Sequence, residues 1–236
     1  MGIPAFLRKR SRRSASLLAT RDTYHARAAR WALRLLVNGK GYRFFIDKEG
    51  FKDADILRLI GLESYSDEEV TLKEGLQMLK TRLSELEQKH HQPDLLDRNL
   101  VKLGDALGLT PAEQTVLAFL SIKEQVEGVE DTLKLFSSGY GLPPTQQLVT
   151  LMSIALQQPR RLIAQALSTE SVLAHCRLVH IRANEGDLAL LNGIDNVLMY
   201  EHQGPESLLR HFTQRGASPE LQPDDFIHID SQYSQL

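Results

Sequence analysis

The alternation of apolar and polar positions along the chain predicts a mainly helical fold. Apolar residues recur at steps of three and four between residues 22 and 38, and again between residues 53 and 62. Such steps place apolar side chains on one side of a helix, and Gly39 and Gly61 stand where each helix would end. Between them, residues 42–46 form a short aromatic run with strand-like composition.

The most regular leucine pattern predicts a helical hairpin. A first stripe repeats with steps of 4, 3, 4 and 3 at Leu72, Leu76, Leu79, Leu83 and Leu86. Ser66 and Glu69 have the spacing of a capping box, so we expect this helix to begin there. A second stripe follows Pro93 from Leu96 to Leu107. The first stripe spans just over two heptads, which favours packing within the chain over a dimeric coiled coil, the alternative use of the same stripe.

The second half of the chain has the order of a winged helix. Thr110 and Glu113 form a capping-box spacing with proline at the first helical position, and further helices are predicted over residues 129–136 and 145–157. A helix over residues 159–167 follows after a very short turn, which is helix-turn-helix spacing. The β-capable runs at residues 172–181 and 196–200 would pair as the wing.

These patterns divide the chain into four parts. We expect a basic N-terminal tail over residues 1–24, a helical subdomain over 25–109, a winged-helix-like subdomain over 110–204, and a C-terminal helix and acidic segment over 205–236. The predicted fold is therefore a mainly α helical bundle or hairpin, followed by a winged-helix-like unit with a small β-wing.

Charge is distributed unevenly along the 236 residues. The total of 28 Lys and Arg against 30 Asp and Glu excludes a uniformly basic nucleic-acid coat. Residues 1–34 nevertheless hold nine Lys and Arg against the single acid Asp22, which leaves 19 bases and 29 acids in the rest. A basic start of this kind is either an electrostatic contact for nucleic acid or an acidic partner, or a solvated tail.

The sequence carries none of the common catalytic signatures. The phosphate-binding loop pattern fails at Arg34 and Gly41, which occupy the positions of its first glycine and of its hydroxyl residue. We therefore expect no ATP hydrolysis, no cofactor and no catalytic residue in this chain.

The single cysteine, Cys176, excludes an intrachain disulfide and favours a cytoplasmic setting. His175, Cys176 and His180 are the one cluster of soft metal ligands, but no fourth ligand accompanies them, so we expect no metal and a buried structural thiol. No apolar run approaches the roughly 20 residues of a membrane span, so no membrane association is expected.

The candidate contact residues are arginines and a lysine. Arg160 and Arg161 open the second helix of the helix-turn-helix, where such side chains reach bases, phosphates or acidic groups of a partner. The other candidates are Arg177 and Arg182 on the wing and Arg8, Lys9, Arg10, Arg12 and Arg13 in the basic tail. The acidic C-terminal third should repel DNA, which favours protein docking over DNA binding.

Several segments together resemble the non-catalytic N-terminal region of a group of bacterial AAA-family ATPases. They are residues 29–36, residues 51–62, residues 100–113 and the acidic-aromatic segment of residues 224–229. In that group an ATPase module with Walker motifs follows such a segment, whereas this sequence stops at Leu236. The resemblance implies an excised domain, a truncated product or a free-standing relative.

Two functions remain from the sequence. The first is a regulatory or partner-recruiting module of an AAA-type ATPase. Such a module would bind an ATPase module in cis or in trans, or a co-encoded protein, and it could form an oligomer. The alternative is a winged-helix DNA-binding protein that uses Arg160, Arg161 and the basic N-terminal arm.

Overall fold

A computed structural model describes residues 24–89, 93–136, 143–182 and 187–211, with the backbone alone at residues 181, 182 and 187. Its elements confirm the mainly α fold with a small β-wing. The first half comprises an N-terminal helix (residues 24–37), α2 (Tyr42–Phe45), α3 (Ala54–Ile60), the 3-10 turn η1 (Glu63–Tyr65), α4 (Leu72–Gln88) and α5 (Leu95–Leu107). The second half comprises α6 (Pro111–Gln125), α7 (Val129–Lys134), α8 (Pro144–Leu156), α9 (Arg160–Ala166), α10 (Val172–His175), β1 (Val179–Arg182), β2 (Asp187–Leu190), α11 (Ile194–Leu198) and α12 (Pro205–Leu209).

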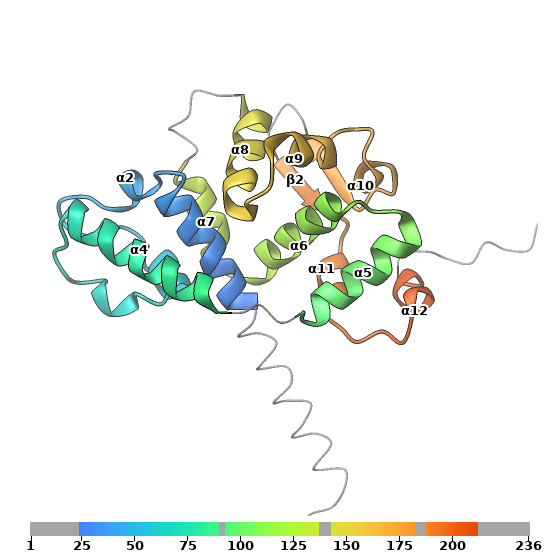
Figure 1. Cartoon of the computed structure of the whole chain (residues 1–236), viewed down its shortest axis with the longest axis horizontal. Coiled ribbons are helices and arrows are strands. Elements are labelled where there is room, and N and C mark those ends of the chain that lie inside the picture. Colours follow the sequence, from blue (N-terminus) through green and yellow to red (C-terminus); the bar gives the residue numbers. More distant parts are fainter. Residues whose placement is uncertain (1–23, 90–92, 137–142, 183–186, 212–236) are drawn as a thin grey trace, which may run out of the picture.

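Helix α6 is the central element of the fold. Every residue from Val116 to Ile122 is buried, as expected for a helix that other elements cover on all sides. It packs against α5, α8, α9 and α11 (Figure 1). On its remaining side the ring of Phe119 lies 5.1 Å from that of Trp31, which joins α6 to the N-terminal helix.

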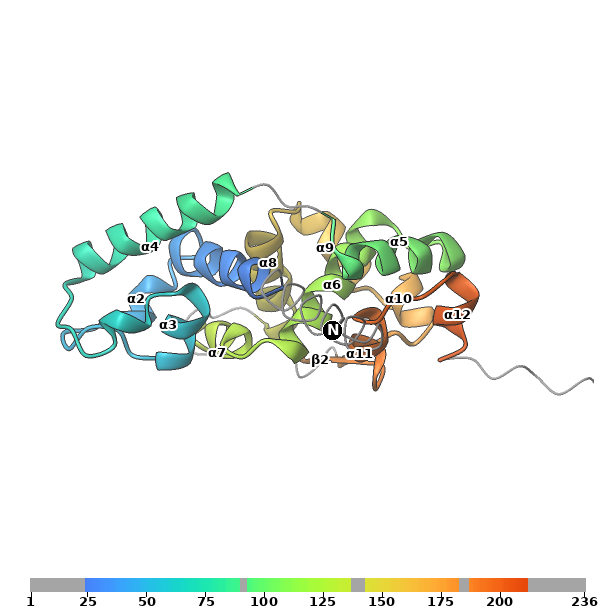
Figure 2. The ribbon, with the colours of Figure 1, turned by 90° about the horizontal axis from the view of Figure 1, so that it is seen from below.

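The helices extend from α6 towards two ends of an elongated body. The N-terminal helix, α2, α3, α4 and α7 lie at one end, and α5, α11 and α12 lie at the other (Figures 1 and 2). Buried apolar residues form one continuous cluster from Tyr24 to Leu208. The expected subdomains of residues 25–109 and 110–204 therefore share a core across the described residues, and their boundary stays a prediction.

The expected hairpin of α4 and α5 is wrong. The two helices lie at opposite ends of the body (Figure 2), and α5 packs against α6, α11 and α12 instead. The physical reason is that each leucine stripe packs against other elements: α4 contacts α2, and α5 contacts α6, α11 and α12. In α4 the residues Leu79, Leu83 and Leu86 are buried, whereas Leu72 at its start is 47% exposed.

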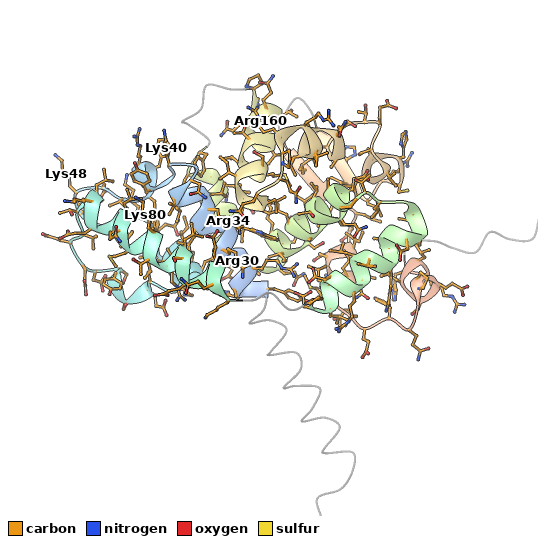
Figure 3. The ribbon with its side chains drawn as sticks, in the orientation of Figure 1. Arg30, Arg34, Lys40, Lys48, Lys80 and Arg160 are labelled. Atoms are coloured by element: carbon orange, nitrogen blue, oxygen red, sulfur yellow. The ribbon has the colours of Figure 1, made fainter. Side chains whose placement is uncertain are left out.

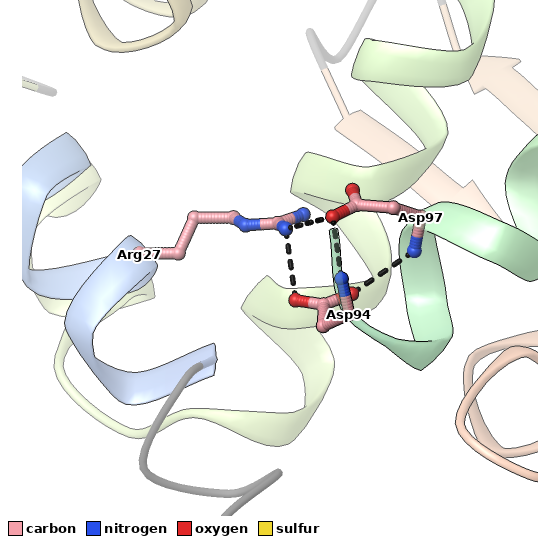
Figure 4. Close-up of polar contacts among 3 residues, drawn as sticks. All are labelled: Arg27, Asp94 and Asp97. Carbon is pink, nitrogen blue, oxygen red and sulfur yellow. Dashed lines mark hydrogen bonds and ion pairs between the residues drawn. The ribbon is translucent and has the colours of Figure 1, made fainter. Parts of the chain in front are cut away.

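A buried ion pair fixes the start of α5 to the N-terminal helix. One terminal nitrogen of Arg27 lies 2.8 Å from a carboxylate oxygen of Asp94 and 2.8 Å from one of Asp97 (Figure 4). The same two carboxylates form the capping box of α5. Tyr24, one turn before Arg27, is also buried here, and burial together with the charge of Asp94 raises its pKa to about 12.

A second buried carboxylate, that of Glu113, joins α6 to α10. One of its oxygens accepts hydrogen bonds from the amide and the hydroxyl of Thr110, both at 2.8 Å, which completes the predicted capping box. The other oxygen accepts the amide of Val172 at 2.7 Å. Burial raises the pKa of Glu113, but the hydrogen bonds from Thr110, Val172 and Leu173 outweigh it and hold this pKa below its ordinary value.

Two predicted features in the first half need correction. Residues 42–45 form the single helical turn α2 and not a strand, with Phe45 buried beneath it. Helix α4 does not begin at Ser66. It begins after Thr71, whose side chain and that of Glu74 form the capping box that is used. The physical reason is that the buried positions of α4 start only at Gly75, one turn after Thr71.

The structure has a small two-stranded sheet, but its strands differ from those expected for the wing. β1 pairs with β2 in antiparallel register, with Val179 opposite Leu190. The start of the first predicted run is α10, because the hydroxyl of Ser171 caps that turn. The second predicted run starts within α11, where Ile194 and Leu198 are both buried at helical spacing, and its last two residues follow this helix. In both runs the residue types favour a strand, but the cap at Ser171 and the four-residue spacing of Ile194 and Leu198 favour a helix.

The other expected helices are confirmed within about two residues over the described ranges. They are the N-terminal helix, α3, α5, α6, α7, α8 and α9, and the start of α12. None of the helices in these ranges has the length and apolarity that crossing a bilayer requires.

Candidate functional site

The turn between α8 and α9 brings the two predicted contact arginines to the surface. Helix α8 ends at Leu156, its C-cap residue Gln157 adopts the left-handed conformation with φ 53°, and Pro159 precedes the first turn of α9. On α9, Ile163 and Ala166 face α6 and α8 and are buried. Arg160 and Arg161, on the opposite side of this short helix, are therefore exposed.

A pocket of about 370 Å³ lies between α8 and α9, and we call it the α8–α9 pocket. Its apolar floor includes Val149 and Leu167, which are 8% and 6% exposed. The remaining lining residues are Thr145, Gln146, Arg160, Arg161 and Ala164. The volume falls within the range of small ligand sites, and it suits an apolar side chain flanked by negatively charged groups.

Neither arginine of this pocket is neutralised by the part of the chain that the structure describes. No acidic group among the described residues lies within ion-pair distance of Arg160 or Arg161. Other arginines of the fold do have partners: Arg58 pairs with Asp55 and Arg82 with Glu85, each at 2.8 Å. Arg160 and Arg161 therefore remain available to a partner with negative charge.

The turn between α8 and α9 holds Gln157 in the left-handed region, which strains the backbone there. A side chain in the left-handed region costs about 1–2 kcal/mol, whereas glycine there costs about 0.5–1 kcal/mol of extra unfolded-state entropy. Replacing Gln157 with glycine is therefore expected to raise the free energy of unfolding by about 0.5–1 kcal/mol in denaturant titration. The converse control is Gly108→Ala, because Gly108 has φ +76° and a Cβ there would meet nothing within 4 Å. An unchanged or lower stability of the Gln157→Gly protein would contradict the assignment of strain to this turn.

Arg160 also belongs to a wider set of cations, which we call the cationic face. Figure 3 labels its members, which come from the N-terminal helix, the following loops, α4 and α9: Arg30, Arg34, Lys40, Lys48, Lys80 and Arg160. Arg34 is neutralised by Glu87 at 3.1 Å and also donates to the backbone oxygen of Ala155 at 3.0 Å. The others make no ion pair with the described residues.

Arg30 is the member of the cationic face whose positive charge is disfavoured by its surroundings. Its Nε atom is buried and has no hydrogen-bond partner in the described part of the protein. Burial, followed by the charges of Arg34 and Arg27, lowers the pKa of Arg30. This arginine adds positive potential to the face, but it is not among the residues that line the α8–α9 pocket.

A second and larger pocket, of about 640 Å³, lies between α3 and α4. Leu62, Tyr65 and Met78 supply its apolar lining. Its arginine, Arg82, is already bonded to the backbone oxygen of Ile60 at 2.9 Å and to Glu85 at 2.8 Å. This pocket therefore lacks the unpaired arginines that distinguish the α8–α9 pocket.

The soft-ligand cluster of the sequence does not form a metal centre in the described structure. Within the described ranges, no three His, Cys, Asp or Glu side chains are grouped as metal ligands. His175 and Cys176 lie at the end of α10 and not on a strand, because Ser171 caps this turn. Cys176 is exposed, which corrects the expected buried thiol.

The structure unites only part of the predicted contact set. Arg160 and Arg161 line one pocket, whereas Arg177 is exposed after α10 and is not among the residues that line it. Arg182 belongs to β1, where its backbone pairs with Asp187 and its side chain is not described. The tail candidates Arg8, Lys9, Arg10, Arg12 and Arg13 lie outside the described residues.

Sequence reasoning missed the apolar half of the site. Val149 and Leu167 are the buried floor of the pocket, while Thr145, Gln146 and Ala164 complete its wall. The signal was present in the four-residue steps from Thr145 to Val149 on α8 and from Arg160 to Ala164 on α9, which align side chains on one side of each helix.

Comparison of the chain with models of protein families, with curated proteins and with solved structures gives no match.

Proposed function

We propose that this protein is a non-catalytic recognition module that recruits a partner protein to an AAA-type ATPase. In this proposal it binds an acidic and apolar segment of the partner in the α8–α9 pocket. The mechanism is recognition alone: carboxylates pair with Arg160 and Arg161, and an apolar side chain covers Val149 and Leu167.

One observation carries this proposal. The same small pocket combines two adjacent exposed arginines that have no acidic partner in the described structure with an apolar floor. A phosphate backbone would use the arginines but leave the apolar floor uncovered. A peptide with neighbouring acidic and bulky apolar residues uses both, so peptide recognition accounts for more of the site.

The ATPase and the compartment rest on the sequence. The resemblance of residues 29–36, 51–62, 100–113 and 224–229 to the N-terminal region of bacterial AAA-family ATPases supports an ATPase module as the neighbour, in cis or in trans. The single cysteine supports a cytoplasmic setting. Because ATP turnover would belong to that neighbour, we expect no ATP binding by this chain in titration calorimetry.

A displayed library of random 12-residue peptides tests the recognition directly. Selection on the full chain is expected to enrich sequences in which Asp or Glu adjoins a bulky apolar residue. The affinity of the selected peptides, measured by fluorescence anisotropy, should fall at least tenfold in the Arg160→Ala/Arg161→Ala protein, which corresponds to about 1.4 kcal/mol. Both arginines are exposed, so the fold should survive their loss.

The matched control removes two other exposed arginines that have no ion pair with the described residues. Arg98 on α5 and Arg210 after α12 lie at the far end of the body, so Arg98→Ala/Arg210→Ala changes the net charge equally without touching the pocket. This control should bind like the unmodified chain. Equal losses in both double variants would show general charge attraction and overturn a specific site.

The cationic face favours DNA binding as a second candidate function. Arg160 belongs to both the pocket and this face, and Lys40, Lys48 and Lys80 are exposed on it (Figure 3). For this candidate, duplex binding should weaken steeply with salt, and the log–log slope should fall by about 1.8 when two phosphate contacts are removed with Arg160 and Arg161. Absence of a gel shift at low salt would eliminate it.

A further inference from the structure

We infer that the acidic-aromatic segment of this same chain, residues 224–229, occupies the α8–α9 pocket and competes with an external partner. This inference rests on the proposed function, because it assigns an occupant to the same site. It would make the module self-masking: a partner gains access only by displacing the chain's own segment.

The residues that line the pocket indicate which segment of the chain would fit it. Two adjacent arginines over an apolar floor call for two adjacent carboxylates followed closely by bulky apolar side chains. Asp224 and Asp225 are followed directly by Phe226 and Ile227. A phenyl ring is the kind of anchor that fills such a pocket at low entropic cost.

The other runs of adjacent acids in the chain are committed elsewhere. The run at residues 67–69 precedes Val70, which is only 7% exposed and belongs to the core. Glu130 and Asp131 on α7 both pair with Lys134, at 3.2 and 3.1 Å. The segment at residues 224–229 lies outside the described residues and is the remaining acidic pair with an apolar continuation.

The tether is long enough to reach the pocket. Helix α12 packs on α5, α5 packs on α6, and α6 packs on α9. Since packed helices lie 8–10 Å apart, these three contacts add up to about 30 Å between the axes of α12 and α9. The 12 residues from 212 to 223 can extend to about 40 Å.

The tether also favours the segment over free competitors. Joining it to the same chain gives it an effective concentration on the order of 1 mM. With an intrinsic dissociation constant of about 100 μM the pocket would be occupied about ten times as often as it is free, so an external peptide would bind about tenfold more weakly.

A labelled synthetic peptide of residues 219–231 is the probe. It is titrated by anisotropy against four full-length proteins: the unmodified chain, Asp224→Asn/Asp225→Asn, Glu220→Gln/Asp230→Asn, and Arg160→Ala/Arg161→Ala. The second and third proteins lose the same charge from the same part of the chain. We expect about tenfold tighter binding to the Asp224→Asn/Asp225→Asn protein than to the unmodified chain, no gain in the Glu220→Gln/Asp230→Asn protein, and at least tenfold weaker binding to the arginine variant than to the Asp224→Asn/Asp225→Asn protein.

Equal peptide affinity for the unmodified and the Asp224→Asn/Asp225→Asn proteins would overturn the inference, as would an absence of binding to the latter. A dimer in sedimentation that the Asp224→Asn/Asp225→Asn change abolishes would place the segment of a neighbouring copy in the pocket and overturn the intrachain form. The proposed function fails separately: its library selection, repeated on the Asp224→Asn/Asp225→Asn protein, has no masking segment and would yield no acidic peptides.

Discussion

Replacing Arg27 with methionine is expected to lower the free energy of unfolding by about 3–5 kcal/mol. The guanidinium group of Arg27, whose side chain is 10% exposed, lies 2.8 Å from both Asp94 and Asp97. Removing it would leave two carboxylates at a packed junction without this cation, and breaking a buried ion pair from one side costs far more than the pair contributes. Guanidinium chloride denaturation followed by circular dichroism measures the change.

Arg58→Met is the matched control for Arg27→Met. Arg58 pairs with Asp55 at the same 2.8 Å distance, but these side chains are 62% and 54% exposed. An exposed pair of this kind contributes between about 0 and 1 kcal/mol. Similar losses in the two variants would mean that burial does not increase the contribution of the Arg27 ion pair to stability. The contact of Arg27 with Asp94 and Asp97, which we call the Arg27 clamp, would then not be a main support of the fold.

Replacing Glu113 with alanine is the second large change, with an expected loss of about 3 kcal/mol. The side chain is 4% exposed and serves both the cap of α6 and the amide of Val172. Without it, part-buried donors on two elements lose a charged acceptor. Glu74→Ala is the comparison, because Glu74 forms the same capping box at the exposed start of α4, where the expected loss is about 1 kcal/mol.

The lowered pKa of Glu113 gives this contribution a pH dependence. A carboxylate whose pKa is lower in the folded than in the unfolded state stabilises the fold above its unfolded value, here 4.5, and loses that effect as the pH falls through the folded value. The stability difference between the unmodified and Glu113→Ala proteins should therefore be constant near neutral pH and shrink below about pH 4.5. A difference that stays the same down to pH 3 would contradict ionisation of Glu113 as its source.

The sequence predicted helices well where apolar spacing and capping agreed. Thr110 and Glu113 marked the start of α6 correctly, because proline at the first helical position and the buried run behind it point the same way. Two capping boxes compete before α4, and the one that adjoins the buried positions is used. The spacing of leucines within a helix does not determine which other element packs against them. The sequence therefore led us to expect that α4 and α5 pair, although each packs against other helices.

Half of the candidate site followed from the sequence. Adjacent arginines after a proline at a short interhelical turn identified Arg160 and Arg161. The pocket beneath them depends on the crossing of α8 and α9 and on the burial of Val149 and Leu167, which only packing decides. The Arg27 clamp was missed for the same reason, since its ends are 67 residues apart in the chain.

The most direct test of the recognition site is a methyl NMR titration of the full-length protein with a library-selected acidic peptide. The account predicts that the methyl resonances of Val149 and Leu167 shift most, and that these shifts vanish in the Arg160→Ala/Arg161→Ala protein. Shifts confined to Leu62 and Met78 in the pocket between α3 and α4, with none at Val149 or Leu167, would contradict it.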